Sequence, residues 1–155
     1  MSEPLFHVAL VFPEIGGNAG NVGRLCLNVG ARLHLVHPLG FQTDEKAVRR
    51  AGLDYWKHVD SREHLSIEDF DRWCEGRAVY ALSARASEPY TRIPFAEGCV
   101  LVFGRESVGL PPAWTASRPS FRIPMVGPTR SLNVANAASV VAYAGLQALR
   151  PGLFT

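Results

Sequence analysis

Short apolar runs alternate with helix-forming segments along this chain, and this order constrains its fold more than any other feature. The expected strands are 5–12, 33–36, 78–82, 99–103 and 121–123. The expected helices are 18–29, 44–51, 66–74 and 132–149, with one helical turn at 111–116. Such alternation is typical of a parallel sheet covered by helices, whose ligands bind at the carboxyl ends of the strands. We therefore predict an α/β fold, although the order of the strands is not derivable.

Polar and glycine residues mark the ends of the expected helices. Asn18 is expected to cap the first helix, which Gly30 ends. Ser66 is expected to cap the third, with Asp69 three residues later as in a capping box. Ser131 is the natural cap of the last helix.

Length and composition indicate one globular domain over residues 1–155. Hydrophobic residues make up 47% of the chain and charged residues 19%, which is typical of folded proteins. The sequence has no apolar run long enough to span a membrane and no signal peptide at its N-terminus. The three cysteines, at 26, 74 and 99, have no metal-binding spacing. We expect reduced core thiols in a cytoplasmic protein.

The net charge of +2 is too small to indicate a nucleic-acid partner by itself. Lys46 and Lys57 are the only lysines among 16 basic residues. Arginine suits phosphate binding and base stacking, although a GC-rich genome produces the same bias.

Three loops follow apolar runs, at 18–24, 104–110 and 123–133. They carry most of the polar residues that do more than contact solvent by their pattern. They contain arginine, glutamate, serine and asparagine, and no cluster of metal ligands. This inventory suits an organic cofactor and an anionic substrate. No metal is expected, because the histidines are scattered without the spacing of ligands.

The first loop is rich in glycine and opens a helix, a context that suits anion binding. Its spacing at Gly17, Gly20 and Gly23 is not that of a dinucleotide fingerprint. Asn21 and Arg24 lie three apart on one helical face, where Arg24 is either functional or merely solvated.

The second loop resembles a nucleophile elbow around Ser107, but Arg105 stands where the elbow needs glycine. No histidine follows His64, so a serine hydrolase with histidine last is excluded. The last helix is rich in alanine, which permits close packing either within the chain or at a homodimer seam.

Four motifs, 13–26, 50–56, 103–111 and 122–136, together resemble the SPOUT RNA methyltransferases. Within that superfamily the match is to the small tRNA 2′-O-methyltransferases that modify the wobble nucleotide, cytidine or uridine 34, of leucine tRNAs. The resemblance implies a Rossmann-like parallel sheet with a C-terminal trefoil knot, and a homodimer formed through the last helix. It also implies tRNA as substrate, bound by its anticodon loop.

S-adenosyl-L-methionine is the cofactor that the resemblance implies. The cofactor-binding positions carried over from the family are Leu82, Gly104, Gly109, Ile123, Ser131 and Leu132. The carried-over catalytic set is Asn18, Arg24, Glu106, Ser131 and Asn133. Departures from the family pattern are Gly16, Gly17, Ala19 and Ala135, which put fine specificity in doubt more than activity.

The resemblance makes Arg24 a general base, a role that conflicts with the basicity of a guanidinium group. We expect Arg24 instead to hold a substrate phosphate and stabilise the developing alkoxide, while a phosphate oxygen or water takes the proton. Glu106 is expected to orient loop residues or Arg24. Arg24, Arg130 and Tyr143 are candidate RNA contacts, as is Trp56.

Two other classes remain open at this point. One is a non-catalytic RNA-binding module on the same fold, against which the intact polar set argues. The other is a nucleotide-dependent oxidoreductase on an α/β sheet.

Overall fold

A seven-stranded parallel sheet forms the centre of the described chain, which confirms the α/β prediction. The computed structural model describes residues 3–43, 46, 53–129 and 131–155. The strand order is β3-β2-β1-β6-β4-β7-β5, and neighbouring strands are parallel throughout. The strands are β1 (Phe6–Val11), β2 (Ala31–Val36), β3 (Ser61–His64), β4 (Val79–Leu82), β5 (Glu88–Pro89), β6 (Val100–Phe103) and β7 (Ser120–Arg122).

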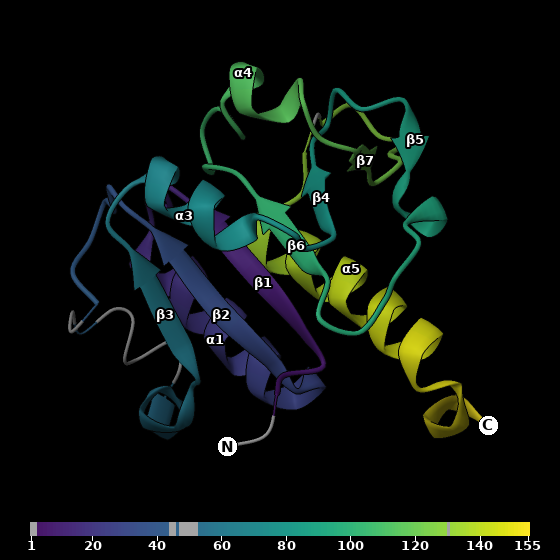
Figure 1. The fold of residues 1–155 in the computed structure, drawn as a ribbon, viewed down its shortest axis with the longest axis horizontal. Coiled ribbons are helices and arrows are strands. Elements are labelled where there is room, and N and C mark those ends of the chain that lie inside the picture. Colours follow the sequence, from purple (N-terminus) through teal and green to yellow (C-terminus); the bar gives the residue numbers. More distant parts are fainter. Residues whose placement is uncertain (1–2, 44–45, 47–52, 130) are drawn as a thin grey trace.

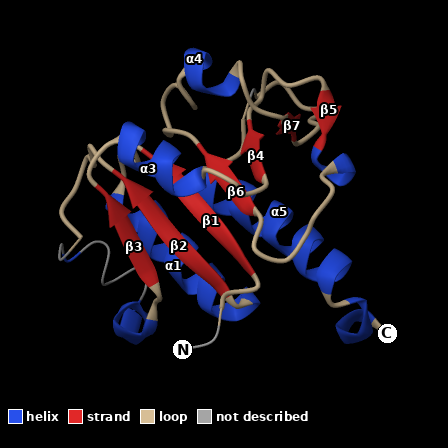
Figure 2. Ribbon diagram, in the orientation of Figure 1, coloured by secondary structure: helices blue, strands red, loops and turns tan. Residues whose placement is uncertain are grey.

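Helices cover both faces of this sheet (Figure 1). They are α1 (Gly16–Val29), α3 (Ile67–Cys74), α4 (Pro112–Thr115) and α5 (Val134–Leu149), with short 3-10 helices η1 (Leu53–His58), η2 (Tyr90–Arg92) and η3 (Pro151–Phe154). In Figure 2, α3 lies in front of the sheet, with α1 and α5 behind it. The α1 and α5 side chains pack on one apolar cluster, and those of α3 and α4 on another.

Alternation along β1 explains the two clusters, because successive side chains of a strand point to opposite faces. Phe6, Val8 and Leu10 belong to the cluster beneath α1 and α5. Ala9 and Val11 belong to the cluster beneath α3 and α4. The sheet is therefore buried on both sides, as parallel sheets usually are.

Two of the four expected helix ends are confirmed, and two expected caps are wrong. Gly30 ends α1 in the left-handed conformation at φ 73°, and the Ser66 hydroxyl accepts from the Asp69 amide at 3.1 Å. Helix α1 begins earlier than expected, so Asn18 lies within its first turn and Ile15 takes the cap position. Helix α5 is capped by Asn133, not by Ser131. The helix expected at 44–51 lies outside the described residues, apart from residue 46.

The expected core cysteines are confirmed, since Cys26, Cys74 and Cys99 are all buried free thiols. Burial raises the pKa of the Cys74 thiol to about 12. No helix in the described ranges is long and apolar enough to cross a membrane.

Three buried histidines form a hydrogen-bonded row across β1, β2 and β3. His7 Nδ1 lies 2.9 Å from His34 Nε2, and His34 Nδ1 lies 2.9 Å from His64 Nε2. Trp73 covers the row, with its ring centroid 4.2 Å from that of His34. Burial lowers the pKa of His7 to about 4, of His34 to about 2 and of His64 to about 4.

The histidine row predicts a loss of stability in mild acid. The folded protein keeps these rings neutral, whereas the unfolded chain protonates them near the ordinary pKa of 6.5. The unfolded state therefore takes up more protons between pH 6.5 and about 4, and stability falls as the pH falls through that window. We expect the urea midpoint to be level between pH 8 and 7 and clearly lower at pH 5. An unchanged midpoint at pH 5 would mean that the folded protein takes up as many protons as the unfolded chain, so that the fold does not hold the rings neutral.

Candidate active site

Two loops that leave neighbouring strands are joined by one carboxylate. Strands β1 and β6 pair in parallel, so their carboxyl ends meet at one edge of the sheet. Glu106, in the loop after β6, accepts hydrogen bonds from the Glu14 amide at 2.9 Å and the Ile15 amide at 3.0 Å. Its second oxygen also accepts from Asn18 Nδ2 at 3.0 Å. Glu106 thus fixes the entry to α1.

Glu14, in the first of these loops, makes the reciprocal contact with the loop after β6. Its carboxylate accepts from the Ser107 amide at 2.9 Å and from the Ser107 hydroxyl at 2.8 Å. These two hydrogen bonds, the backbone one first, hold the pKa of Glu14 below its usual value. The two loops are therefore cross-linked reciprocally, and Ser107 has a structural partner instead of the histidine that a hydrolase would need.

The third polar loop joins the same network through its last residue. Asn133 Nδ2 donates to Asn18 Oδ1 at 3.1 Å. Asn133 Oδ1 accepts from the Ala135 amide at 2.8 Å and so caps α5. Three of the five carried-over catalytic residues, Asn18, Glu106 and Asn133, are thus brought together by contacts that the sequence did not specify.

The loop after β6 is closed so tightly that its first residue has to be glycine. A Cβ atom on Gly104 would lie 2.2 Å from the Gly109 carbonyl carbon and 2.2 Å from the Leu110 nitrogen. Gly109 has φ +74°, and two backbone hydrogen bonds between Arg105 and Gly109 close the turn. The result is a compact backbone cradle at the carboxyl end of β6.

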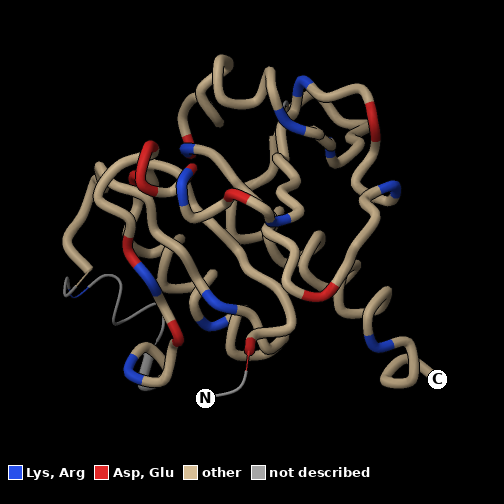
Figure 3. Tube along the Cα trace, viewed as in Figure 1, with Lys and Arg blue, Asp and Glu red and all other residues tan. Residues whose placement is uncertain are grey.

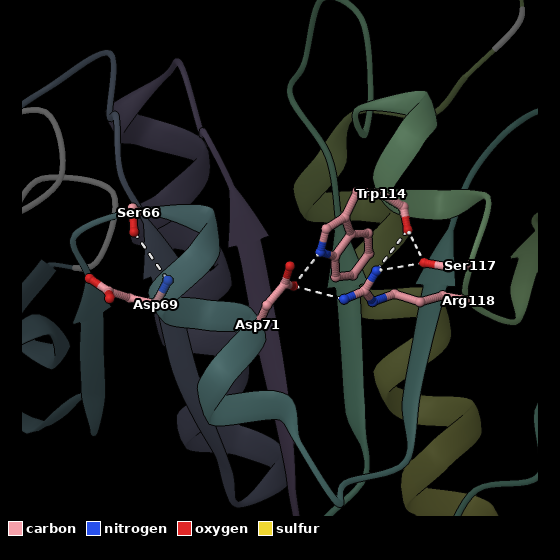
Figure 4. Close-up of polar contacts among 6 residues, drawn as sticks. All are labelled: Ser66, Asp69, Asp71, Trp114, Ser117 and Arg118. Carbon is pink, nitrogen blue, oxygen red and sulfur yellow. Dashed lines mark hydrogen bonds and ion pairs between the residues drawn. The ribbon is translucent and has the colours of Figure 1, made fainter.

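A polar cluster on the other face of the sheet anchors the far end of this loop (Figure 4). Trp114 Nε1 donates to Asp71 Oδ1 at 2.6 Å, and Arg118 Nη2 donates to the same oxygen at 2.8 Å. The Arg118 guanidinium lies 3.9 Å from the centroid of the Trp114 ring. Because α4 follows the loop directly, its attachment to α3 limits how far residues 104–110 can move.

The carried-over cofactor positions lie at the carboxyl ends of three strands. Leu82 ends β4, Gly104 follows β6, and Ile123 follows β7. The order β6-β4-β7 places these strands next to one another. Leu132 lies exposed before α5, as does Ser131. Val126 and Met125, in the same loop as Ile123, also expose apolar surface to solvent.

Arg24 is not hydrogen-bonded to the described residues of the network that joins the three loops. It is exposed on α1, and its guanidinium carbon lies 4.8 Å from the centroid of the Tyr55 ring. Among the described residues, no hydrogen bond or ion pair links Arg24 to Glu106, so the expectation that Glu106 orients Arg24 is not met. Glu106 orients loop residues, as the other half of that expectation had it.

The candidate RNA contacts differ in their surroundings. Tyr143 is 43% exposed on the outer side of α5. Trp56 packs against Gly23 and the apolar core, so its main contribution is to packing. Arg130 lies outside the described residues. Figure 3 shows basic and acidic positions interspersed along the described trace.

Sequence reasoning missed the role of Glu14, and it considered Ser107 only as a nucleophile, a role that it rejected. Glu14 follows the first strand directly, at the edge where ligands bind in such sheets, and that position was the signal available. The histidine row escaped notice because its members are far apart in sequence. Within the described ranges, no group of three or more histidine, cysteine, aspartate or glutamate residues could hold a metal ion.

Replacing Glu106 with glutamine should disorder the shared edge of the first two loops. The amide group would turn a donor toward groups that already donate, leaving at least one of them unpaired at a cost of about 1–3 kcal/mol. We expect a lower thermal midpoint and a loss of kcat/KM of about fivefold to 100-fold, taking 1.4 kcal/mol per factor of ten. Glu63→Gln, on the exposed edge strand β3, is the matched control. Equal activity of both variants would contradict a role for this carboxylate.

Comparison with known proteins gives a consistent set of similarities. Residues 5–143 match the model of the SpoU rRNA methylase family. The chain is 39% identical over 148 residues to the tRNA (cytidine(34)-2′-O)-methyltransferase of Escherichia coli K12, covering 90% of each protein. It also resembles a structure solved in work on the 2-OH methylation of C/U34 on tRNA, with TM-score 0.92 and 45% identity over 96% of this chain and 98% of that one. An AdoMet-bound rRNA methyltransferase from Sinorhizobium meliloti has TM-score 0.87 and 27% identity over 96% of this chain and 58% of that one.

Proposed function

Because this chain belongs to the SpoU methylase family, we propose that it methylates the ribose 2′-hydroxyl of the wobble nucleotide, cytidine or uridine 34, of tRNA. The similar protein from Escherichia coli is named for cytidine 34, and the similar solved structure concerns C/U34. Leucine tRNAs are the proposed isoacceptors. The observation that carries the proposal is the network of Asn18, Glu106 and Asn133, which joins three loops at one edge of the sheet.

The residues at this edge fit S-adenosylmethionine as the methyl donor. Gly104 lets the loop after β6 close on itself, and the Arg105–Gly109 hydrogen bonds hold this backbone in place at the carboxyl end of β6, where the cofactor is proposed to bind. Leu82, Ile123 and Leu132 provide apolar surface for the adenosine. When bound, this cofactor supplies a methyl group carried on a positively charged sulfonium.

The protein's own groups have two tasks in this reaction. The first is alignment of the ribose oxygen, which contributes up to about 7–11 kcal/mol in favourable cases. Asn18, Glu106 and Asn133 serve this task by fixing the loops, since both Glu106 oxygens already accept hydrogen bonds. The second task belongs to Arg24, which holds a substrate phosphate and stabilises the charge that develops on the 2′-oxygen. The proton passes to a phosphate oxygen or to water.

Ser131 completes the proposed catalytic set, positioned by the loop that precedes α5. Arg24, Arg130 and Tyr143 are the proposed RNA contacts. A nucleotide in the anticodon loop is accessible to such residues because its base can be unstacked and read by stacking and edge contacts. We assign the enzyme to the cytoplasm, where its reduced core thiols and its tRNA substrate are expected.

A homodimer through α5 is also part of the proposal. The small residues Ala138, Ala142 and Gly145 are buried within the chain, which accounts for one side of the helix. The opposite side exposes Val140 and Tyr143 to solvent. These apolar groups suit the packing of a second copy. The C-terminal segment that leads into this helix is proposed to form a trefoil knot.

Incubation of the purified protein with labelled S-adenosylmethionine and bulk tRNA tests the function. We expect label in tRNA, and a rise in the thermal midpoint with S-adenosylhomocysteine. Binding of both ligands without transfer would favour the non-catalytic RNA-binding module. A thermal shift with NADH that S-adenosylhomocysteine does not give would favour the oxidoreductase instead.

A further inference from the structure

Tyr55 lies on a short helix that is locked against α1 beside the proposed functional arginine. Helix η1 contacts α1, and the residue after Tyr55, Trp56, packs on Gly23. The fit is tight, since a Cβ on Gly23 would lie 2.8 Å from Trp56 Cζ3. The same Cβ would lie 3.4 Å from Val59 Cγ2. The position of the Tyr55 backbone is therefore set by core packing.

The Tyr55 ring meets the Arg24 guanidinium at the surface. The guanidinium carbon lies 4.8 Å from the ring centroid, within the range of a cation–π contact. Tyr55 is 43% exposed, so burial of the ring does not explain its presence. Among the side chains that the structure describes, which do not include those of residues 53 and 54, none makes a hydrogen bond or ion pair with Arg24. A long, exposed side chain without such a contact samples many rotamers.

We propose that Tyr55 is a positioning residue for the methyl-transfer reaction, whose ring holds Arg24 in the orientation that meets the substrate. This inference rests on the proposed function. The electron-rich ring face attracts the cation without neutralising it, unlike a carboxylate, so the full positive charge stays available for a phosphate. Neighbouring Trp56 supplies the rigidity, and Tyr55 supplies the contact.

The test compares Tyr55→Phe, which keeps the ring, with Tyr55→Leu and Tyr55→Met, which keep apolar bulk without it. We expect Tyr55→Phe to retain kcat almost fully, and the other two to lose up to about fivefold, the upper end of what an exposed cation–π contact supports. The KM for S-adenosylmethionine and the thermal midpoint should stay unchanged in all three. This split between kcat and KM, with rescue by phenylalanine, is not expected of a merely structural residue.

Each outcome of this test has a definite meaning. Equal kcat values for phenylalanine and leucine at position 55 would overturn the positioning role while the methyltransferase function stands. A parallel fall in the thermal midpoint and kcat of both non-aromatic variants would also overturn it, in favour of a packing role. Absence of methyl transfer by the unmodified protein would instead contradict the proposed function itself.

Discussion

Gly104→Ala should abolish cofactor binding while leaving the sheet folded. The added methyl carbon would lie 2.2 Å from two backbone atoms of residues 109 and 110, where ordinary contacts begin at 3.4 Å. The loop has to open, because neither neighbour is the end of a flexible side chain. The segment that follows the loop is held in place, since Trp114 and Arg118 are hydrogen-bonded to Asp71. We expect S-adenosylhomocysteine to bind at least about 100-fold more weakly, or roughly 2.7 kcal/mol.

Titration calorimetry measures this loss, and circular dichroism checks that the fold persists. Gly17→Ala is the matched control, because its added methyl group would meet nothing within 4 Å. Gly17 lies in the first turn of α1, where alanine fits a helical backbone, so this control should keep its stability and bind normally. Normal binding of S-adenosylhomocysteine by the position 104 variant would show that the loop after β6 does not form the cofactor site.

Arg24→Ala should remove most of the methyl transfer without affecting cofactor binding. Loss of a charged group aimed at a developing negative charge typically lowers kcat by about 10²–10³-fold. Arg24 lies on the exposed face of α1, so the fold should be unchanged. Single-turnover transfer of labelled methyl to tRNA measures the effect, and calorimetry with S-adenosylhomocysteine is the control. Wild-type turnover by this variant would exclude Arg24 from the reaction.

Arg24→Lys separates the two roles considered for this residue. A guanidinium that only binds phosphate and stabilises charge should be replaced poorly by an ammonium, with no new ionisation in the pH–rate profile. A lysine enzyme with near-full activity and a new ionisation near the pKa of lysine would restore the general-base role. The two results are distinguishable in one series of assays.

The alternation of apolar runs was sufficient to predict the fold class and most elements, but not all of them. Strand β3 (Ser61–His64) was missed because an edge strand with three exposed positions has no apolar signature. Strand β5 (Glu88–Pro89) is too short to leave a pattern. Strand order was not predictable either, since periodicity reports which face of a strand is buried and not which strand lies beside it.

The candidate site was predictable to the level of loops and not to the level of contacts. Parallel strands place their carboxyl ends at one edge, so the gathering of the three loops follows from the pattern. The caps were misassigned because Asn18 and Ser131 are good capping residues by type. The Asn18 side chain contacts Glu106 and Asn133 instead, and Asn133, itself a good capping residue, caps α5 locally. The residue identities carried over from the family supplied what spacing alone did not.

Mapping ribose methylation in tRNA from cells with and without the gene tests the central claim most directly. The account predicts a 2′-O-methyl group at nucleotide 34 that disappears with the gene. It should return with the intact gene on a plasmid and not with the Arg24→Ala form. Methylation at nucleotide 34 that persists unchanged in cells lacking the gene would contradict it.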